Sequence, residues 1–499
     1  MSLWIAVHLP FLPLEVFRPN WLNDTAMVVF ERDRVSAASA LARADGVSED
    51  MRRGGVQLLS PQALQHERDV LRESAALEET ALALLQYTPQ ATLAEDACVL
   101  LDIGASLRLF GGIRALCRRV QASVARLGFT ISLGCAPTAA GAWLLARSGV
   151  LQVRRVLRLP RLQARLNQLP LGLLSAATPY LEWLHGIGCR QLGHLRRLPR
   201  AGLQRRCGKP LLQMLDQAYG AAPELHQWIS APPSFHARQE LPDRIEQAEI
   251  LLAYARKLLE QMCGWLSARQ LAVKQIVLQM EHERGRQAVA PTVITLTLAD
   301  AIWQDTHLTQ LLKERLARTE LQKPAIAMSL SAGRVESMQL ASDALFPEPG
   351  GTPEDHHRLI ELLTARLGPE HVLQAAPLAD HRPEVSNRWQ SVTDLSSTRA
   401  AALPSAPSAL PPRPLWLLEQ PIPLRLRQHK PFYGTPLHMV STAERIEAGW
   451  WQEQQTTRDY YVACDERHVH YWIFKEWRRD AHQEHAHTEP HWFLHGLFA

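Results

Sequence analysis

The sequence predicts a multidomain α+β protein. Between residues 97 and 147, short apolar runs alternate with amphipathic stretches, which indicates strands alternating with helices. The same alternation returns between residues 248 and 335, and the last fifth of the chain holds six of the fourteen tryptophans. A chain of 499 residues with 46% hydrophobic and 21% charged residues can bury several cores, so we expect three or four domains.

The first alternating segment predicts half of a ferredoxin-like sheet. A buried strand is expected at 97–103 and a second strand at 129–133, because both are short apolar runs. A helix is expected at 139–147, and the apolar run at 3–9 predicts a further strand. The helix between the first two strands is indicated by apolar residues at helical spacing: Leu116, Val120, Val124 and Leu127.

Two strands and a long helix are expected between the N-terminal strand and this segment. The strands are predicted at 27–31 and 35–39, around the turn Arg32-Asp33-Arg34. The helix is predicted at 70–87, where leucines recur among alanines and the pattern stops before Pro89. Its length and pattern suit packing on the ferredoxin-like sheet.

A basic block follows the helix at 139–147. From Arg147 to Lys209 the chain carries thirteen arginine and lysine residues against one acid, Glu182. Cations that neutralise phosphates release condensed counterions, so the block predicts sequence-independent contact with nucleic acid. The alternative is a solvated surface rich in arginine.

A helix-hairpin-helix is predicted within the basic block. The stretch 184–188 has two glycines and is followed by Leu192 and Leu195, and such glycines allow backbone amides to approach a phosphate. An ordinary turn between helices is the alternative. A second loop at 205–209 is expected to serve the same face. The residues expected to contact DNA are Gly186, Gly188, Arg190, Arg196, Arg197, Arg205, Arg206 and Lys209.

Pro232-Pro233 predicts a boundary before the second alternating segment. Lys274, Arg284 and Arg286 are candidates there for contacts to a nucleic-acid backbone, with a solvated strand edge as the alternative. The expected order is helix, strand, strand, helix and strand, at 248–268, 273–281, 293–298, 308–319 and 325–335.

The cysteines and the apolar runs favour a protein of the reducing cytoplasm. The seven cysteines are scattered without a Cys-x-x-Cys pair, which predicts neither a disulfide framework nor a zinc ribbon. No segment reaches the roughly 20 apolar residues that a membrane span requires. We therefore expect a cytoplasmic location, no membrane partner, no cofactor and no metal. For the histidine-rich run 482–487 we favour a solvated loop over a metal site.

The stretch Glu95–Gly112, EDACVLLDIGASLRLFGG, resembles the palm of Y-family translesion DNA polymerases. In that family the corresponding strand ends in Ser-x-Asp-Glu-Ala-Tyr-Leu-Asp. When its last two residues are aligned with Leu101-Asp102, Gly134 falls in step with the family's Gly-Ile-Ser motif.

The same alignment places the family's metal-ligand positions on residues whose side chains cannot bind Mg²⁺. The Asp-Glu pair falls on Ala97 and Cys98, and the Asp-x-Asp-x-Phe-Phe motif falls on the stretch that begins His8-Leu9-Pro10. Two-metal phosphoryl transfer needs hard oxygen ligands that hold two Mg²⁺ ions about 3.5 to 4 Å apart. Alanine and proline offer no side-chain donor atom, and a thiol is too soft for Mg²⁺. We expect no catalytic residues, because the family positions are replaced at His8, Pro10, Ala97 and Cys98.

The resemblance implies that part of the family's nucleotide-binding motif is missing. The family's Tyr-x-Ala-Arg-x-x-Gly-Val motif falls on Ala40–Val47, so the phosphate-contacting arginine survives as Arg43 while the tyrosine has become Ala40. The aromatic residue that screens the sugar falls at Pro13. Arg43 is therefore expected to be a relic of phosphate binding. The pattern as a whole is similar to the catalytically inactive branch of the family that serves in the bacterial mutasome.

The resemblance implies a right-hand architecture with an aromatic-rich C-terminal domain. The expected parts are a ferredoxin-like palm at 1–17 and 75–169, fingers at 18–74, a helix-hairpin-helix thumb at 170–231, a little finger at 232–338, a clamp-binding motif and linker at 339–413, and a partner-binding domain at 414–499.

A sliding-clamp motif is predicted at the start of the linker. Bacterial clamp ligands are short extended peptides that end in Leu-Phe, whose side chains fill a preformed pocket. Ser342-Asp343-Ala344-Leu345-Phe346 matches this pattern, with Ser342 in place of the favoured glutamine. The alternative is a linker whose Leu345 and Phe346 dock on the little finger.

The C-terminal segment is expected to bind proteins. Its tryptophans are Trp416, Trp450, Trp451, Trp472, Trp477 and Trp492. Aromatic residues are common interface anchors, although they also build the core of small β-rich domains. The resemblance implies contacts with a RecA-like accessory protein and an error-prone replicative-type DNA polymerase.

We therefore expect a non-catalytic adaptor in DNA-damage-induced translesion synthesis, which binds DNA and the sliding clamp and recruits an error-prone polymerase. One alternative is an active translesion polymerase that uses the displaced carboxylates Glu95 and Asp96. Another is a DNA-binding module without protein partners, which the Leu-Phe motif and the aromatic tail disfavour.

Overall fold

The computed structural model describes residues 2–22, 25–149, 154–283, 289–338, 353–378, 380–392, 412–449, 456–476 and 491–498. The chain divides into two compact units, Met1–Arg366 and Leu367–Ala499, which are described separately. Three predicted features lie outside the described residues: the motif at 342–346, the histidine-rich run, and the tryptophans at 450, 451 and 477.

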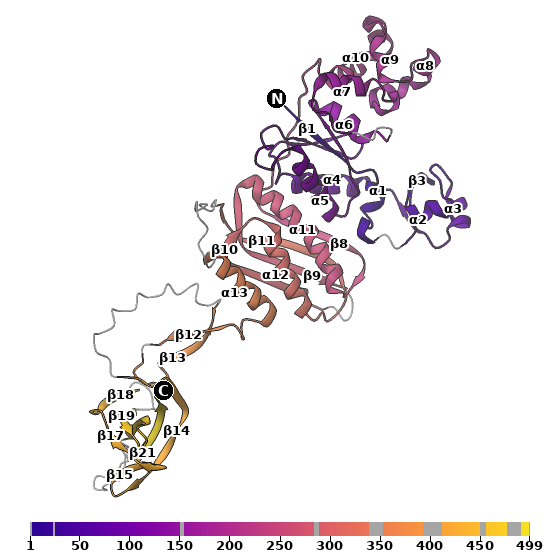
Figure 1. Cartoon of the computed structure of the whole chain (residues 1–499). Coiled ribbons are helices and arrows are strands. Elements are labelled where there is room, and N and C mark those ends of the chain that lie inside the picture. Colours follow the sequence, from indigo (N-terminus) through magenta and orange to yellow (C-terminus); the bar gives the residue numbers. More distant parts are fainter. Residues whose placement is uncertain are drawn as a thin grey trace. The chain divides into compact units, whose positions relative to one another are not determined.

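The palm is a four-stranded antiparallel sheet with the order β5-β6-β1-β7 (Figure 1). Helix α4 connects the first two strands in the chain and α5 the last two, which is the ferredoxin-like topology that the sequence predicts. Ile5 and Val7 pack toward α4 and α5 on one face, and Trp4 and Ala6 pack toward α6 on the other, because neighbouring side chains of a strand alternate. The elements are β1 Trp4–His8, α4 Val70–Leu84, β5 Ala91–Ala94, β6 Cys98–Asp102, α5 Ile113–Arg126, β7 Ser132–Ala136 and α6 Ala139–Arg147.

One palm strand begins later than the sequence predicts. The expected strand at 129–133 is replaced by β7, which begins at Ser132. Phe129 is buried in the core, and the Thr130 amide donates to Glu15 Oε2 at 2.8 Å. Because these two residues are held before the ladder begins, the apolar side chain of Phe129 reflects core packing rather than strand pairing.

The fingers form a small three-stranded sheet with the order β3-β2-β4, in which β4 runs parallel to β2. Val28, Phe30 and Val56 form part of its core. Strands β2 and β3 confirm the two strands predicted around the turn Arg32-Asp33-Arg34. The elements of this region are α1 Leu12–Glu15, β2 Met27–Glu31, β3 Arg34–Ala38, α2 Ala40–Ala44, α3 Arg53–Leu59 and β4 Leu64–Glu67.

The thumb is helical and shares a hydrophobic core with α6 of the palm. The second loop predicted at 205–209 is shorter than expected, because Arg205 and Arg206 continue a helix as far as a break at Gly208, which has φ 80° and ψ 175°. This break divides α10 into two helical parts, and the chain turns back there, since Arg200 and Asp216 near the two ends of α10 are in contact. The helices are α7 Leu159–Leu166, α8 Leu181–Gly186, α9 Leu192–Arg197 and α10 Arg200–Ala218.

The little finger is a four-stranded sheet with the order β10-β9-β11-β8, covered by α11 and α12. Strand β8 was not predicted. Its sequence, HARQELPDRI, is mostly charged or polar, because it is an edge strand that pairs only with β11 and carries most of its side chains in solvent. The elements are β8 His236–Ile245, α11 Ala248–Arg269, β9 Leu271–His282, β10 Thr292–Ile302, α12 Asp305–Arg318, β11 Ala325–Ser337 and α13 Pro353–Leu367.

The second unit is rich in β structure, as predicted. Its main sheet has the order β16-β15-β14-β21-β20-β19-β17, with β18 paired to β19. Tyr460, Trp472 and Phe474 lie buried together, so part of the aromatic content forms a core. The strands are β12 Leu373–Pro377, β13 Asn387–Ser391, β14 Trp416–Arg427, β15 Lys430–Tyr433, β16 Thr435–Pro436, β17 His438–Met439, β18 Glu444–Ala448, β19 Thr456–Cys464, β20 His470–Glu476 and β21 His491–Leu497.

The observed mixture of sheets and helices confirms the predicted α+β class. In the described part of the chain, no helix combines the length and apolar character needed to cross a bilayer.

Candidate functional site

Three side chains form a row across the palm sheet at the position of the expected metal ligands. His8 on β1 lies opposite Cys98 on β6 in the strand register, and opposite Ser132 on β7 on its other side. The Leu9 amide donates to the Ala97 carbonyl at 3.0 Å, which extends the contact beyond the ladder. The strand pairing therefore brings together two of the replaced positions, His8 and Cys98, and places Ala97 beside them.

Neither titratable member of this row carries charge near neutral pH. Burial, helped by the positive charge of Arg147, lowers the pKa of His8 to about 4. Burial raises the pKa of the Cys98 thiol to about 12. His8 is thus a neutral imidazole, and Cys98 is a protonated thiol that donates to the Asp96 carbonyl at 3.3 Å.

The two nearby carboxylate residues lie in the turn between β5 and β6. Asp96 and Ala97 both adopt positive φ, at 56° and 51°, as tight hairpin turns require. Arg147 Nη2 lies 2.5 Å from Asp96 Oδ2, and its side chain is only 13% exposed. The Trp143 indole donates to the Glu95 carbonyl at 3.1 Å. Two side chains of helix α6 therefore fix the turn between β5 and β6 in place.

Arg147 is itself fully engaged. Its Nη1 donates to the Leu173 carbonyl at 2.7 Å, and its guanidinium carbon lies 4.4 Å from the centroid of the Trp143 ring. The sequence places Arg147 in the basic block and predicts a nucleic-acid contact. Its spacing of four residues from Trp143 on one helix is the signal for the stacked pair.

The residues at this position do not fit a pair of magnesium ions. A neutral imidazole, a protonated thiol and an alanine supply none of the hard oxygen ligands that Mg²⁺ requires. The Asp96 carboxylate is paired with a guanidinium. Among the described residues, no group of three or more His, Cys, Asp and Glu side chains is arranged to hold a metal ion.

Arg43 lies beside the turn that follows β1. Its Nε donates to the Ala38 carbonyl at 2.8 Å, and its guanidinium carbon lies 5.2 Å from the centroid of the Phe11 ring. Arg43 is exposed, so its remaining donors face solvent next to the segment that carries Pro10. This location is compatible with contact to a phosphate.

The predicted hairpin joins α8 to α9 in the thumb. Gly188 has φ 80°, and no atom lies within 4 Å of a Cβ built on Gly186 or Gly188, so the surface there is open. The Ile187 and Gly188 amides already donate to the carbonyls of Trp183 and His185, at 3.2 and 2.9 Å. The hairpin therefore offers an open backbone surface, while these two amides are engaged within the loop.

The predicted thumb cations are exposed on α9, α10 and the hairpin. Arg206 lies over the Trp183 ring at 5.1 Å, which brings α10 next to α8, and Arg196 lies over the Tyr219 ring at 4.5 Å. Figure 1 shows α8, α9 and α10 gathered at one end of the first unit. In the described part of the thumb, no carboxylate pairs with any of these cations: Arg190, Arg196, Arg197, Arg205, Arg206 and Lys209.

Other members of the basic block have structural partners. Arg200 forms a bidentate contact with Asp216, at 2.9 and 2.5 Å. Arg154 donates to the Ser132 hydroxyl of the palm row. The block is therefore divided between cations that stabilise the fold and cations that face solvent, a division that charge counting could not predict.

The little-finger candidate that the structure describes, Lys274, is paired with a carboxylate, and so is Arg238 on β8. Lys274, one of the candidates, lies 3.3 Å from Glu336, and Arg238 binds Glu281 at 2.8 and 3.0 Å. The other two candidates, at 284 and 286, lie outside the described residues. One of the three little-finger candidates is therefore already bound to an acidic side chain.

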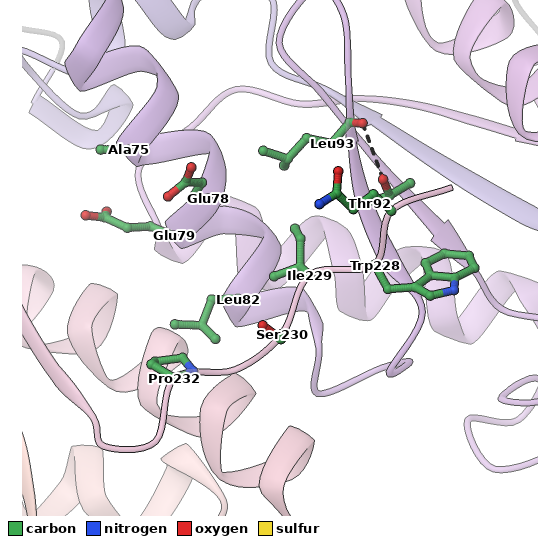
Figure 2. Close-up of a pocket in the computed structure, with 11 residues that line it drawn as sticks. Ala75, Glu78, Glu79, Leu82, Thr92, Leu93, Trp228, Ile229, Ser230 and Pro232 are labelled. Carbon is green, nitrogen blue, oxygen red and sulfur yellow. Dashed lines mark hydrogen bonds between the residues drawn. The ribbon is translucent and has the colours of Figure 1, made fainter. Parts of the chain in front are cut away.

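A groove of about 710 Å³ lies beside the connection from the thumb to the little finger. Figure 2 shows residues of α4, among them Glu78 and Leu82, lining this groove together with Ile229 and Pro232 of the connection, which passes close to β5. The Ile229 amide donates to the Ala91 carbonyl at 2.9 Å. The connection is thus attached to the outer strand of the palm sheet.

Comparisons with known proteins identify a matching family model and similar proteins. Residues 11–147 match the model of the impB/mucB/samB family. Protein ImuB of Caulobacter vibrioides, from strain NA1000 / CB15N, is 27% identical over 465 residues, which cover 88% of this chain and 97% of the relative. The chain is similar to ImuB over most of its length. The protein of strain ATCC 19089 matches to the same extent.

This similarity to ImuB confirms the resemblance to Y-family polymerase-like proteins that the motifs predict. Among solved structures, the insertion ternary complex of Dbh DNA polymerase aligns with a TM-score of 0.38 and 16% identity, covering 67% of this chain and 99% of that chain. DinB from Sulfolobus solfataricus aligns with a TM-score of 0.37 and 16% identity, over 66% and 98% of the two chains.

Proposed function

We propose that this chain is a non-catalytic, Y-family polymerase-like adaptor that acts in tolerance of DNA damage by translesion synthesis. It binds DNA through the thumb, docks on the sliding clamp and recruits an error-prone replicative-type polymerase, which performs the chemistry. The observation that carries this proposal is the pairing of His8 with Cys98 across the palm, with Ala97 beside them, where the family's hard oxygen ligands would be needed.

The pairing of Asp96 supports the absence of catalysis. An active polymerase with displaced ligands would need Glu95 and Asp96 to turn toward incoming metal ions. Asp96 is instead held by Arg147, which also binds the Leu173 carbonyl and stacks on Trp143. Moving Asp96 would leave a nearly buried guanidinium without its anion, which is costly.

A primer-extension assay tests this part of the proposal. We expect the purified full chain to add no nucleotide to a primer in Mg²⁺ or Mn²⁺. Binding of the same primer-template by the same preparation serves as the control for folding. Metal-dependent extension that is lost in the double variant Glu95→Ala plus Asp96→Ala would overturn the proposal.

The exposed thumb cations support DNA binding. Among the described residues, six cations without carboxylate partners lie on α9, α10 and the hairpin, beside an open glycine turn. Arginine and lysine contacts to phosphates carry no sequence information, so the proposed binding is sequence-independent. Arg43 supplies a further cation near the palm.

The clamp contact rests on the sequence 342–346. We expect replacement of Leu345 and Phe346 by alanine to abolish clamp binding, because these two side chains would fill the clamp pocket. Affinity for DNA should stay unchanged in this variant, since the thumb is untouched. Clamp binding by this variant at the wild-type level would show that 342–346 is not the clamp-binding motif.

The second unit is the proposed docking surface for the accessory protein and the recruited polymerase. Trp416 and Trp389 are 68% and 73% exposed, and Leu415 is 79% exposed. Large exposed aromatic and apolar side chains are frequent anchors of protein interfaces. A pull-down with candidate polymerases, comparing wild type with Trp416→Ala, tests this assignment, and equal recovery of the polymerase would refute it.

A further inference from the structure

Two cysteine thiols lie in contact between helix α5 and the edge strand β7 of the palm sheet. Cys117 lies on α5 and Cys135 on β7, and their Sγ atoms are 3.5 Å apart. Both are free cysteines, and Cys117 is half-buried whereas Cys135 is buried. A disulfide requires an S–S distance of about 2.05 Å, so a small approach of α5 toward β7 would join them.

The half-buried thiol of Cys117 has the more reactive surroundings of the two. The hydrogen bond between Cys117 and Cys135, followed by the charge and hydrogen bond of Arg155, lowers the pKa of Cys117 against the opposing effect of burial. The contact with Cys117 and burial both raise the pKa of Cys135. The pair thus combines a half-buried thiol of lowered pKa with a buried thiol beside it, which is the arrangement of an attacking and a resolving cysteine.

We propose that Cys117 and Cys135 form a dithiol site that hydroperoxides oxidise to an intramolecular disulfide. This site lies on the face of the palm sheet that packs against α5, opposite the face of the palm row. Cys117 is the less buried of the two and would be oxidised first, and Cys135 is close enough to intercept the first product before further oxidation.

The reaction balances with hydrogen peroxide as the oxidant. The Cys117 thiolate attacks one peroxide oxygen, so that an S–O bond forms, the O–O bond breaks and hydroxide leaves; with the proton that Cys117 gave up, this makes water. The Cys135 sulfur then attacks Cys117, the S–S bond forms, and the S–O bond breaks. The leaving hydroxide and the Cys135 proton make a second water. Two thiols lose two electrons to one peroxide.

The disulfide would tie α5 to the place where the chain enters the thumb. The Cys135 amide donates to the Arg154 carbonyl at 2.8 Å, and its carbonyl accepts from the Val156 amide at 2.8 Å. Cys135 therefore anchors the segment 154–156 to the palm edge. Oxidation would add a covalent link between this anchor and helix α5.

Thiol counting and peptide mapping of the full chain test the proposal. After one equivalent of hydrogen peroxide and denaturation, we expect the titratable thiols to fall from seven to five, since two of the seven cysteines are joined. Mass spectrometry without reductant should find the peptides of Cys117 and Cys135 linked, and dithiothreitol should separate them. Seven remaining thiols, or a link between other cysteines, would overturn the site.

Variants separate the roles of the two thiols. In Cys135→Ala, we expect dimedone to trap a sulfenic acid at Cys117, and in Cys117→Ala we expect no oxidation of Cys135. Cys263→Ala is the matched control, because this buried cysteine on α11 lies outside the pair, and its variant should form the disulfide normally.

The oxidation rates of individual cysteines give a third test. Cys464 is also half-buried but has no thiol neighbour among the described residues. We expect Cys117 to oxidise at least about tenfold faster than Cys464, and Arg155→Leu to slow Cys117 alone. Equal rates at Cys117 and Cys464 would refute the proposal.

Discussion

Arg147 restrains Asp96 at the turn between β5 and β6, with 2.5 Å between Arg147 Nη2 and Asp96 Oδ2. Asp96 occupies positive φ and its side chain is 46% exposed, whereas the guanidinium is nearly buried. The arginine therefore does more than neutralise a surface acid. It joins the turn to α6 and, through the Leu173 carbonyl, to the start of the thumb.

We expect Arg147→Met to destabilise the first unit by about 2 kcal/mol, because the Asp96 carboxylate and the Leu173 carbonyl would both lose a charged donor. The measurement is the urea midpoint of the full chain, together with amide exchange at 95–98. Arg158→Met is the matched control, since Arg158 is exposed and should change the midpoint little. Equal midpoints for the two variants would contradict the proposed restraint.

We expect removal of solvent-facing thumb cations to weaken DNA binding and its salt dependence. Each lost phosphate contact should reduce the slope of log K against log salt by about 0.9 for duplex DNA. Arg197→Ala and Arg205→Ala are the test variants, measured by fluorescence anisotropy over a salt series. Arg200→Ala is the control, because Arg200 is bound to Asp216. A larger loss of DNA affinity in Arg200→Ala than in the two test variants would show that the DNA-binding surface lies elsewhere.

Gly264 is expected to be required for contact between α11 and α4. A Cβ at this position would lie 2.0 Å from the Leu82 carbonyl oxygen and 2.7 Å from Ala83 Cα, so the two helices would have to separate. We expect Gly264→Ala to cost about 1–3 kcal/mol, as overpacked sites do, and to lower the thermal midpoint.

The control for this change is Gly202→Ala. Gly202 is exposed on α10, and no atom lies within 4 Å of the position that a Cβ would take there, so alanine should be neutral or slightly stabilising. A Gly264→Ala midpoint equal to that of Gly202→Ala would show that the α11–α4 contact tolerates separation.

Glu224 is expected to make stability depend on pH. Its carboxylate accepts from the Ala139 and Ala140 amides at the start of α6, at 3.0 and 2.9 Å, and burial raises its pKa from 4.5 to about 7. Because the folded chain holds the proton more tightly, the stability from Glu224 is present below pH 4.5 and is lost as pH rises to about 7.

The test compares wild type with Glu224→Gln between pH 4.5 and 7.5. We expect the wild-type midpoint to fall with rising pH relative to the variant, whose side chain does not titrate. The difference between the two curves removes the contributions of other groups, including His8, whose lowered pKa acts with the opposite sign. Parallel curves would exclude Glu224 as the source.

Local pattern was sufficient for much of the fold. Helix α6 occupies the predicted range, and β2, α11 and β11 lie within one or two residues of theirs, because apolar periodicity and capping act within a few residues of the chain. Strand β8 could not be found in this way. An edge strand is stabilised by backbone pairing with β11, and its mostly polar side chains carry no strand signal.

The sequence by itself determined that Ala97, Cys98 and Pro10 have no side-chain oxygen to offer a metal ion, whatever surrounds them. Only the tertiary structure decided which charges are engaged. Arg147 and Arg200 belong to the same basic block as Arg205, yet the first two meet carboxylates and the third faces solvent. Asp96 reaches Arg147 from another element, and Asp216 reaches Arg200 across the break at Gly208, so both distances follow from packing rather than from spacing along the sequence.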